Sequence, residues 1–189
     1  MILKVTTSIC LTLVTFVAFA NNQRSDSADI RHININLDIT DYANQEIAGN
    51  CILDIHSKMA GLDVLNFDLL NLTVDSVLVD GTTTSFTNNG RLIAVDFSTA
   101  LNVGDSASVN IFYHGSPAQD PQWGGFYWQG NYAYNLGVAF VDNPHNYGRV
   151  WFPCFDNFAE KSTYEFHITT TDDKLSLIHI SEPTRPEDI

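Results

Sequence analysis

The chain has 189 residues and a mass of 21.0 kDa. Hydrophobic residues make up 44% of it, which is enough apolar material for one packed core and excludes a wholly disordered protein. The net charge is −13 and the sequence contains no run of basic residues, so its electrostatics argue against nucleic acid or an anionic lipid surface as a partner.

Residues 1–20 have the pattern of a secretory signal peptide. Lys4 lies in a short start, an apolar run follows, and the run closes on Ala18-Phe19-Ala20, a small-x-small cleavage pattern. The apolar stretch is short for a membrane-spanning helix, which needs about 20 residues. We therefore expect an exported protein, periplasmic or extracellular, with no membrane span after the signal is cleaved.

Two cysteines, Cys51 and Cys154, remain after that cleavage, because Cys10 lies in the leader. An exported pair can form a disulfide. The apolar segments around them favour instead two buried thiols that pack as small hydrophobic side chains. The chain has no Cys-x-x-Cys motif and no Cys/His spacing typical of a zinc site.

The body of the chain has the pattern of β-strands. From Ile33 onward, apolar residues at odd positions alternate with Asn34, Asn36 and Asp38, which indicates a strand with one buried and one polar face. Turn signals at residues 41–45, 80–81, 88–90 and 102–105 separate further strands expected within 47–56, 62–79, 92–97, 109–114 and 164–169.

These short strands predict an all-β fold, either a β-sandwich or twisted antiparallel sheets. Residues 121–158 break the rhythm, because aromatic residues and glycines are dense there and alternation is lost. This segment is expected to be a long irregular stretch. It can serve as a lid over the sheet, as a platform for sugar stacking or as a docking face for another domain.

One motif inside this segment is distinctive: residues 148–157 read G-R-V-W-F-P-C-F-D-N. Arg149 and Asp156 can pair with each other or cap buried backbone groups, and Pro153 suits a bend because it has no amide proton. An anion site at Arg149 is the alternative. The structural residues of the motif are Arg149, Trp151, Phe152, Pro153, Cys154 and Asp156.

This motif and the following Lys161–Phe166 resemble the R-x-x-F-P-C-x-D-x-P … K-x-x-F/Y pattern in the N-terminal domain of the aminopeptidase N family. These proteins are gluzincin zinc aminopeptidases. Residues 29–35, 49–55, 77–81, 113–117 and 125–128 resemble further landmarks of that domain, in the same order, so the resemblance covers roughly residues 29–171.

The resemblance implies a fold and a division of labour. The fold is the family's N-terminal β domain with saddle-like antiparallel sheets. That domain is non-catalytic, packs against the catalytic domain of the same polypeptide and walls one side of its active site. The parent is then an exported zinc aminopeptidase that removes N-terminal residues from peptides, and both the zinc and the peptide substrates belong to the parent.

The sequence departs from the family's pattern at two places. Phe158 stands where the family usually has proline. The family also places Gln and Glu, two apart, ahead of F-P-C-x-D, where they line the pocket for the substrate's amino-terminal residue. Counting back from Asp156 puts Asp142 and Pro144 at those positions. Asp142 is therefore the candidate substrate-binding residue, with a turn at Asp142-Asn143-Pro144 as the structural alternative.

The histidines do not form the family's zinc motif. Zinc aminopeptidases need H-E-x-x-H and a distal glutamate, whereas no histidine here precedes a glutamate and no pair has that spacing. We therefore predict no catalytic residue, no metal ligand and no bound zinc in this chain. The histidines in question are His32, His56, His114, His145, His167 and His179.

The C-terminal residues are unlike the rest of the chain. Residues 175–185 resemble the translation of a transposase sequencing adapter, and the family resemblance stops just before them. We expect a signal peptide at 1–20, a β domain at 21–174 that is incomplete at its C-terminal end, and an artefact at 175–189.

Two other functions remain open at this stage. One is a secreted β-sandwich module that binds carbohydrate or protein, with Trp123, Trp128 and Trp151 as platforms. The other is a structural domain whose acidic loops, such as Asp142-Asn143, bind calcium. An H-E-x-x-H motif further along the source DNA would favour the peptidase, and glycan binding would favour the module.

The signal pattern makes a direct prediction about processing. We expect cleavage between Ala20 and Asn21, so mass spectrometry of the exported product should find Asn21 as its first residue. Recovery of chains that keep Met1 in a membrane fraction would contradict this.

Overall fold

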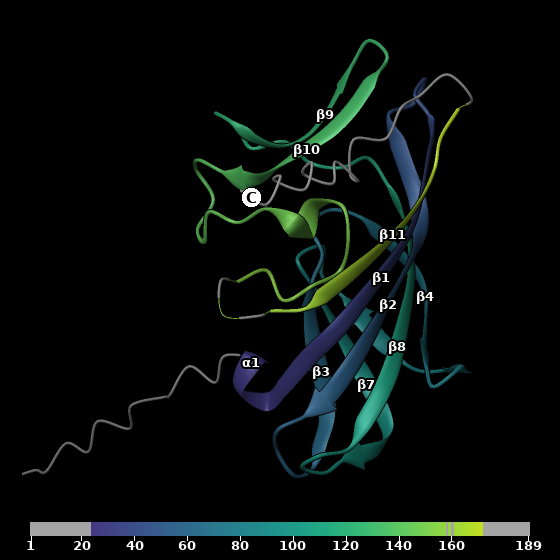
Figure 1. Cartoon of the computed structure of the whole chain (residues 1–189), viewed down its shortest axis with the longest axis vertical. Coiled ribbons are helices and arrows are strands. Elements are labelled where there is room, and N and C mark those ends of the chain that lie inside the picture. Colours follow the sequence, from purple (N-terminus) through teal and green to yellow (C-terminus); the bar gives the residue numbers. More distant parts are fainter. Residues whose placement is uncertain (1–23, 158, 160, 172–189) are drawn as a thin grey trace, which may run out of the picture.

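The computed structural model describes residues 24–157, 159 and 161–171. This part consists mainly of strands, with one short helix, α1 (Arg24–Ser27), and one 3-10 turn, η1 (Gly148–Val150) (Figure 1). The predicted all-β class is confirmed. Among the described residues, no helix is long and apolar enough to cross a membrane. The strands are β1 (Ala28–Asp41), β2 (Glu46–Ser57), β3 (Leu62–Asp68), β4 (Thr73–Val79), β5 (Thr82–Thr83), β6 (Phe86–Asn88), β7 (Leu92–Leu101), β8 (Ser106–Gly115), β9 (Gly124–Gln129), β10 (Tyr132–Ala139) and β11 (Thr163–Thr169).

The strands form three sheets. The largest has six strands in the order β11-β1-β2-β8-β4-β5, and a second has three in the order β3-β7-β6. Strands β9 and β10 form a separate two-stranded sheet, an antiparallel hairpin. In Figure 1 the three-stranded sheet lies behind the six-stranded sheet, and the β9–β10 hairpin lies at one end of both.

The core lies between the six-stranded and three-stranded sheets, and strand alternation determines which residues enter it. On β1, Ile33 and Ile35 are buried while Asn34 and Asn36 are half-exposed on the opposite face, as the period of two requires. The same alternation buries further apolar residues on both sheets: Cys51, Leu53, Ile55, Leu65, Phe67, Ile93, Val95, Val109, Ile111 and Tyr113.

The turns follow the local signals in the sequence. Asp80 and Gly81 connect β4 to β5 with positive φ angles of 49° and 76°, the conformation that a two-residue hairpin turn with right-handed twist requires. Turns also separate β1 from β2, β6 from β7 and β7 from β8 at the predicted places. Residues 62–79 form two strands, β3 and β4, in different sheets.

One strand pair differs from the antiparallel expectation. β11 pairs with β1 in parallel, with Ile33 opposite Tyr164 and Ile35 opposite Phe166. A parallel neighbour needs a long crossover, and the chain supplies it by passing through the β9–β10 hairpin and η1 before it returns to the sheet edge.

The expectation of an irregular stretch at residues 121–158 was wrong for its first half, which contains the β9–β10 hairpin with a two-residue turn at Gly130-Asn131. Glycines hid the strand pattern but permit the pairing. A Cβ added to Gly124 would lie 2.0 Å from the carbonyl oxygen of Val138, so a larger residue there would separate the two strands.

Candidate functional site

Arg149 is the centre of a buried polar network between η1 and the loop that follows β10. Its Nη1 donates to Asp156 Oδ2 at 2.6 Å and to the carbonyl oxygen of Asn146 at 2.9 Å, and its Nη2 donates to Asp142 Oδ2 at 2.9 Å. Only 8% of the Arg149 side chain is exposed. We call Arg149, Asp142, Asp156, Asp68 and Arg24 the motif network.

The two carboxylates keep Arg149 charged inside the protein. Burial by itself would lower the pKa of Arg149, but hydrogen bonds and charge attraction from Asp142 and Asp156 outweigh burial and raise that pKa. The guanidinium also lies 5.0 Å from the centre of the Tyr147 ring, a cation–π arrangement. This arrangement satisfies the cation internally, so the structure favours an ion pair over an anion site at Arg149.

Asp156, near the end of the motif, accepts hydrogen bonds from the backbone at the start of the motif. Its Oδ1 accepts from the backbone N–H of Gly148 at 3.2 Å, and its Oδ2 accepts from the backbone N–H of Arg149 at 3.3 Å. A Cβ on Gly148 would lie 3.3 Å from both Asp156 Oδ1 and the Phe152 ring, so the glycine permits the close approach. The sequence motif predicted either an Arg149–Asp156 ion pair or capping of backbone groups, and the structure contains both.

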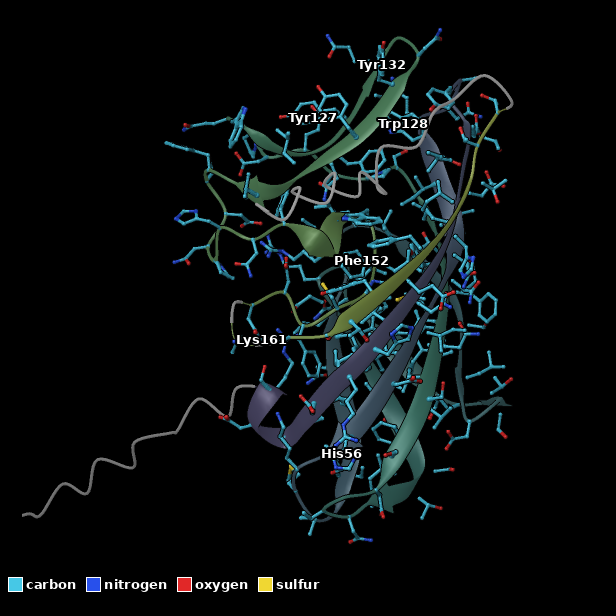
Figure 2. All side chains as sticks on the ribbon, in the orientation of Figure 1. His56, Tyr127, Trp128, Tyr132, Phe152 and Lys161 are labelled. Atoms are coloured by element: carbon cyan, nitrogen blue, oxygen red, sulfur yellow. The ribbon has the colours of Figure 1, made fainter. Side chains whose placement is uncertain are left out.

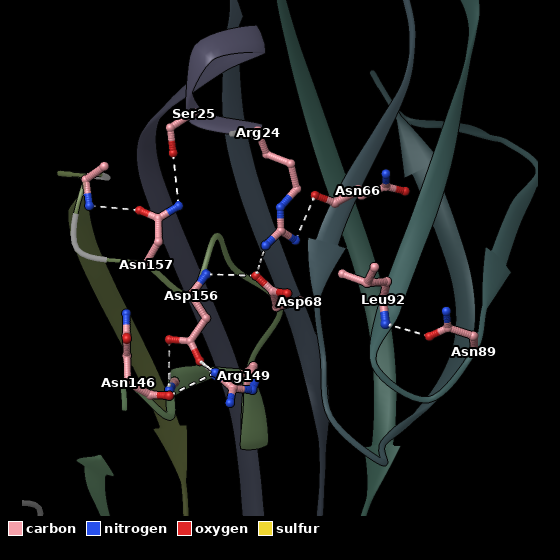
Figure 3. A network of polar contacts seen from close by, with 12 residues as sticks. Arg24, Ser25, Asn66, Asp68, Asn89, Leu92, Asn146, Arg149, Asp156 and Asn157 are labelled. Carbon is pink, nitrogen blue, oxygen red and sulfur yellow. Dashed lines mark hydrogen bonds and ion pairs between the residues drawn. The ribbon is translucent and has the colours of Figure 1, made fainter. Parts of the chain in front are cut away.

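Asp68, at the end of β3, ties the motif to the rest of the fold (Figure 3). Its Oδ2 accepts from the backbone N–H of Asp156 at 2.9 Å and from Arg24 Nη2 at 2.6 Å. Backbone hydrogen bonds also join Asp68 and Cys154 in both directions, at 2.8 and 3.1 Å. The motif is therefore anchored to both β3 and α1.

Aromatic packing and two thiols complete the environment of the motif. Phe155 stacks on Phe67 with ring centres 5.5 Å apart. Cys51 and Cys154 are free and buried, and Cys51 Sγ lies 3.8 Å from the carbonyl oxygen of Pro153. Burial raises the pKa of both thiols, which keeps them protonated and unreactive.

Trp151 and Phe152 connect the motif to β11. The two rings meet edge to face at 4.7 Å, and Trp151 stacks on Phe166 at 6.1 Å. Phe152 is buried, while Trp151 is half-buried. Their contacts are those of packing residues.

Asp120, which sequence reasoning missed, holds the base of the β9–β10 hairpin. Its Oδ1 accepts from the backbone N–H groups of Gln122 and Trp123, each at 3.0 Å. Its Oδ2 accepts from those of Val141 and Asp142, at 3.0 and 3.3 Å. One carboxylate thus bonds both the segment before β9 and the segment after β10. The Asp120-Pro121 pair is a turn signal that could have identified it.

These hydrogen bonds determine the titration of Asp120. Burial by itself would raise its pKa, but the four backbone N–H donors stabilise the charged form and lower the pKa to about 2. Asp120 is therefore ionised at any pH near neutrality.

A surface pocket of about 250 Å³ lies beside this base. Asp120 and Asp142 both line it, and the Asp142 side chain is 26% exposed. Pro144, the second position carried over from the family, is exposed and is not among the lining residues. The pocket is formed by Leu70, Asn71, Arg91, Ala118, Gln119, Asp120, Pro121, Val141, Asp142 and Tyr147.

Each histidine within the described residues contacts a carboxylate, a hydroxyl or a backbone carbonyl group. His32 and His167 both approach Glu165, at 3.7 and 2.9 Å, while His114 lies 2.9 Å from Asp75. His56 contacts Ser106, and His145 lies 3.2 Å from the carbonyl oxygen of Ala139.

Within residues 24–157, 159 and 161–171, no group of three or more His, Cys, Asp or Glu side chains could hold a metal ion. The residues that the structure describes therefore do not fit a zinc ion. His179, Phe158, the signal-like residues 1–20 and the adapter-like residues 175–189 lie outside the described residues.

The buried ion pair predicts a large effect on stability. Arg149→Met would leave Asp156 buried without its counter-charge, and we expect the free energy of unfolding to fall by about 3–5 kcal/mol. Urea denaturation measures this. Arg31→Met is the control, because its pair with Asp29 is exposed and 3.7 Å long, and its loss should cost less than about 1 kcal/mol. Equal losses in the two variants would contradict the central role of Arg149.

The hydrogen bonds of Asp120 predict that the base of the β9–β10 hairpin is stabilised in a pH-dependent way. In Asp120→Asn, an NH₂ group replaces one carboxylate oxygen, so one pair of backbone N–H donors loses its acceptor. Hydrogen exchange should then be faster than in the wild type at the pair that faces the NH₂ group, reported by Trp123 for one oxygen and by Val141 for the other. Because the folded pKa lies below the ordinary value of 3.8, the advantage of the wild type is fully present above about pH 4 and disappears as the pH falls through about 2. Asp41→Asn, at the C-terminal end of β1, should leave this exchange unchanged.

Solved structures of larger proteins share this fold. An M1 zinc metallopeptidase from Deinococcus radiodurans, solved with a Tyr-Ser-Ala substrate, superposes with a TM-score of 0.67 at 20% identity over 76% of this chain and 33% of that one. Leukotriene A4 hydrolase from Saccharomyces cerevisiae gives 0.56 at 20% identity, over 77% and 24%. At these identities the likeness shows the fold.

A curated relative is the transcription initiation factor TFIID subunit 2 of Schizosaccharomyces pombe, 25% identical over 202 residues. The alignment covers 84% of this chain and 16% of that protein. The chain thus spans a third or less of the length of these relatives.

The family comparison covers most of the chain. The model of the Peptidase M1 N-terminal domain matches residues 25–186, which include the pocket, the β9–β10 hairpin and the motif network apart from Arg24. The fold expected from the aminopeptidase N resemblance is confirmed. The chain belongs to the Peptidase M1 N-terminal domain family.

Proposed function

We propose that this chain is the N-terminal, non-catalytic β domain of an exported zinc aminopeptidase that removes N-terminal residues from peptides. The observation that carries the proposal is the family match over residues 25–186, joined to the fact that the chain covers only 33% of the Deinococcus zinc metallopeptidase. Export is supported by the signal pattern of residues 1–20.

In this proposal the rest of the parent polypeptide carries the catalytic groups. Zinc bound there would supply Lewis-acid chemistry. The described residues provide architecture: the motif network fixes the loop after β10, and Asp120 fixes the hairpin base.

Asp142 is the residue proposed to contact substrate. Its Oδ2 accepts from Arg149, its backbone N–H donates to Asp120, and its side chain borders the pocket. Its orientation is therefore fixed on two sides, while part of the carboxylate faces solvent. Such a group can accept a hydrogen bond from the ammonium group of a peptide's amino-terminal residue.

The alternative is a secreted module that binds carbohydrate or protein. It is supported by Trp123, which is 55% exposed, and by the curated relative, whose name describes a transcription factor subunit. The other two tryptophans have internal partners, since Trp128 packs edge-on against Tyr42 and Trp151 stacks on Phe166. A row of three stacked sugar platforms is therefore not formed, which leaves the peptidase domain as the better supported function.

The test is an activity measurement on purified Asn21–Lys174. With added zinc, this fragment should bind no stoichiometric metal and hydrolyse no aminoacyl anilide, whereas the full-length parent expressed from the longer gene should do both. Turnover by the fragment that survives repurification and disappears with a chelator would contradict the non-catalytic assignment. A parent without H-E-x-x-H would contradict the peptidase assignment.

A further inference from the structure

The pocket at the base of the β9–β10 hairpin has charged residues of both signs along its walls. Asp120 and Asp142 border it next to the hairpin, and Arg91, in the turn between β6 and β7, borders it as well. Figure 2 shows Tyr132 at the far end of the hairpin, so the pocket lies at the opposite end of that element. A site with both a cation and an anion selects a ligand that carries both charges.

Arg91 is the cation at this site that has no counter-ion. In the part of the chain that the structure describes, no carboxylate forms an ion pair with it, whereas Arg24, Arg31 and Arg149 each have one. Arg91 is also exposed. Its guanidinium can therefore bind the carboxylate of a ligand through two parallel hydrogen bonds without first breaking an internal ion pair.

The turn that carries Arg91 is fixed to a segment that lines the pocket. The carbonyl oxygen of Arg91 accepts from the backbone N–H of Leu69 at 3.1 Å, and that of Gly90 accepts from the backbone N–H of Asn71 at 2.8 Å. The side chain of Asn89 accepts from the backbone N–H of Arg91 at 2.9 Å. Because Asn71 itself borders the pocket, these bonds fix the base of the Arg91 side chain relative to it.

Asp142 provides a negative charge whose orientation is fixed. Arg149 shares its single charge between Asp142 and Asp156, at 2.9 and 2.6 Å, so negative charge remains on this pair of carboxylates. Asp120 adds a second carboxylate at the pocket, but its oxygens already accept from four backbone N–H groups. The partly exposed carboxylate of Asp142 is therefore the group available to an ammonium group.

Tyr147 shows that charges of both signs act on one small volume. It lines the pocket and is buried. Burial and the charge of Asp142 raise the pKa of its hydroxyl, and the charge of Arg91 acts in the opposite direction. The pocket has a volume of about 250 Å³, less than the roughly 300–1,000 Å³ typical of sites for drug-sized ligands, so its ligand is small.

We propose that this pocket binds one amino-acid residue that carries both an ammonium and a carboxylate group, with Asp142 receiving the ammonium group and Arg91 the carboxylate. The inference rests on the proposed function, which supplies the ammonium contact of Asp142, and it makes Arg91 the specificity-determining residue. Two sources have this chemistry. A free amino acid carries both groups on its α-carbon, and the acidic first residue of a peptide carries the carboxylate on its side chain.

Ligand titration of the purified chain tests the proposal. Binding is followed by NMR through the backbone N–H signals of Asn71 and Asp142 and the Nε–H signal of Arg91. The probes separate the charges: leucine carries both on its α-carbon, leucinamide carries only the ammonium group, and N-acetylleucine carries only the carboxylate. Aspartic acid α-amide combines the ammonium group with a side-chain carboxylate.

We expect a probe with both charges to bind at least about tenfold more tightly than leucinamide or N-acetylleucine, a difference of about 1.4 kcal/mol. Tighter binding of leucine would assign the pocket to a free amino acid, and tighter binding of aspartic acid α-amide would assign it to an acidic first residue. Arg91→Gln should remove the preference for a carboxylate, and Arg91→Lys should keep part of it because the cation remains. Arg31→Gln is the matched control, because it removes an exposed guanidinium on β1 and should leave binding unchanged.

Three results would overturn the inference: no shift with any probe, equal affinity for all of them, or an unchanged preference in Arg91→Gln. Assaying the full-length parent with leucyl anilide separates this inference from the proposed function. A parent that hydrolyses the anilide, with no probe bound by the chain, would leave the proposed function intact. Binding with the expected preference, in a chain whose parent lacks hydrolytic activity, would support the pocket and contradict the proposed function.

Discussion

The buried charge of Arg149 is the constraint on which the conformation of the segment between β10 and β11 depends. A guanidinium with so little exposure would be strongly destabilising without counter-charges, so Asp156 and Asp142 must converge on it from opposite sides of the loop. That convergence fixes the loop between β10 and β11 without regular secondary structure. Through Asp68 and Arg24 the same constraint reaches β3 and α1, so a network of few side chains orients the motif relative to both large sheets.

Asp120 is the counterpart of this network on the hairpin side. Its two oxygens hold the segments on either side of the hairpin, and the backbone of Asp142 is one of the groups it holds. The loop that carries Asp142 is therefore fixed twice, by a cation on its side chain and by an anion on its backbone. These two sets of bonds fix the position of Asp142 at the edge of the pocket.

The geometry separates structural from catalytic contributions. The chain belongs to the Peptidase M1 N-terminal domain family and has its β fold. Its described residues provide a fixed framework of strands and ion pairs, with one partly exposed carboxylate, Asp142, at the edge of the pocket. Peptide hydrolysis by a longer parent is a proposal, and it rests on the family match and on the fold shared with the Deinococcus metallopeptidase.

The sequence alone determined the β class, the main turns and the character of the F-P-C-F-D motif. Those features depend on contacts near in sequence: side-chain alternation with a period of two, glycine at turns, and the short spacing from Arg149 to Asp156. It did not reveal the β9–β10 hairpin, because the large residues of β10 face solvent and the usual burial pattern is reversed. Only the tertiary structure decided the parallel pairing of β11 with β1 and the hydrogen bonds that Asp120 accepts from Val141 and Asp142. These arise from segments that the folded sheets bring together, and no local pattern in the chain specifies which of them meet.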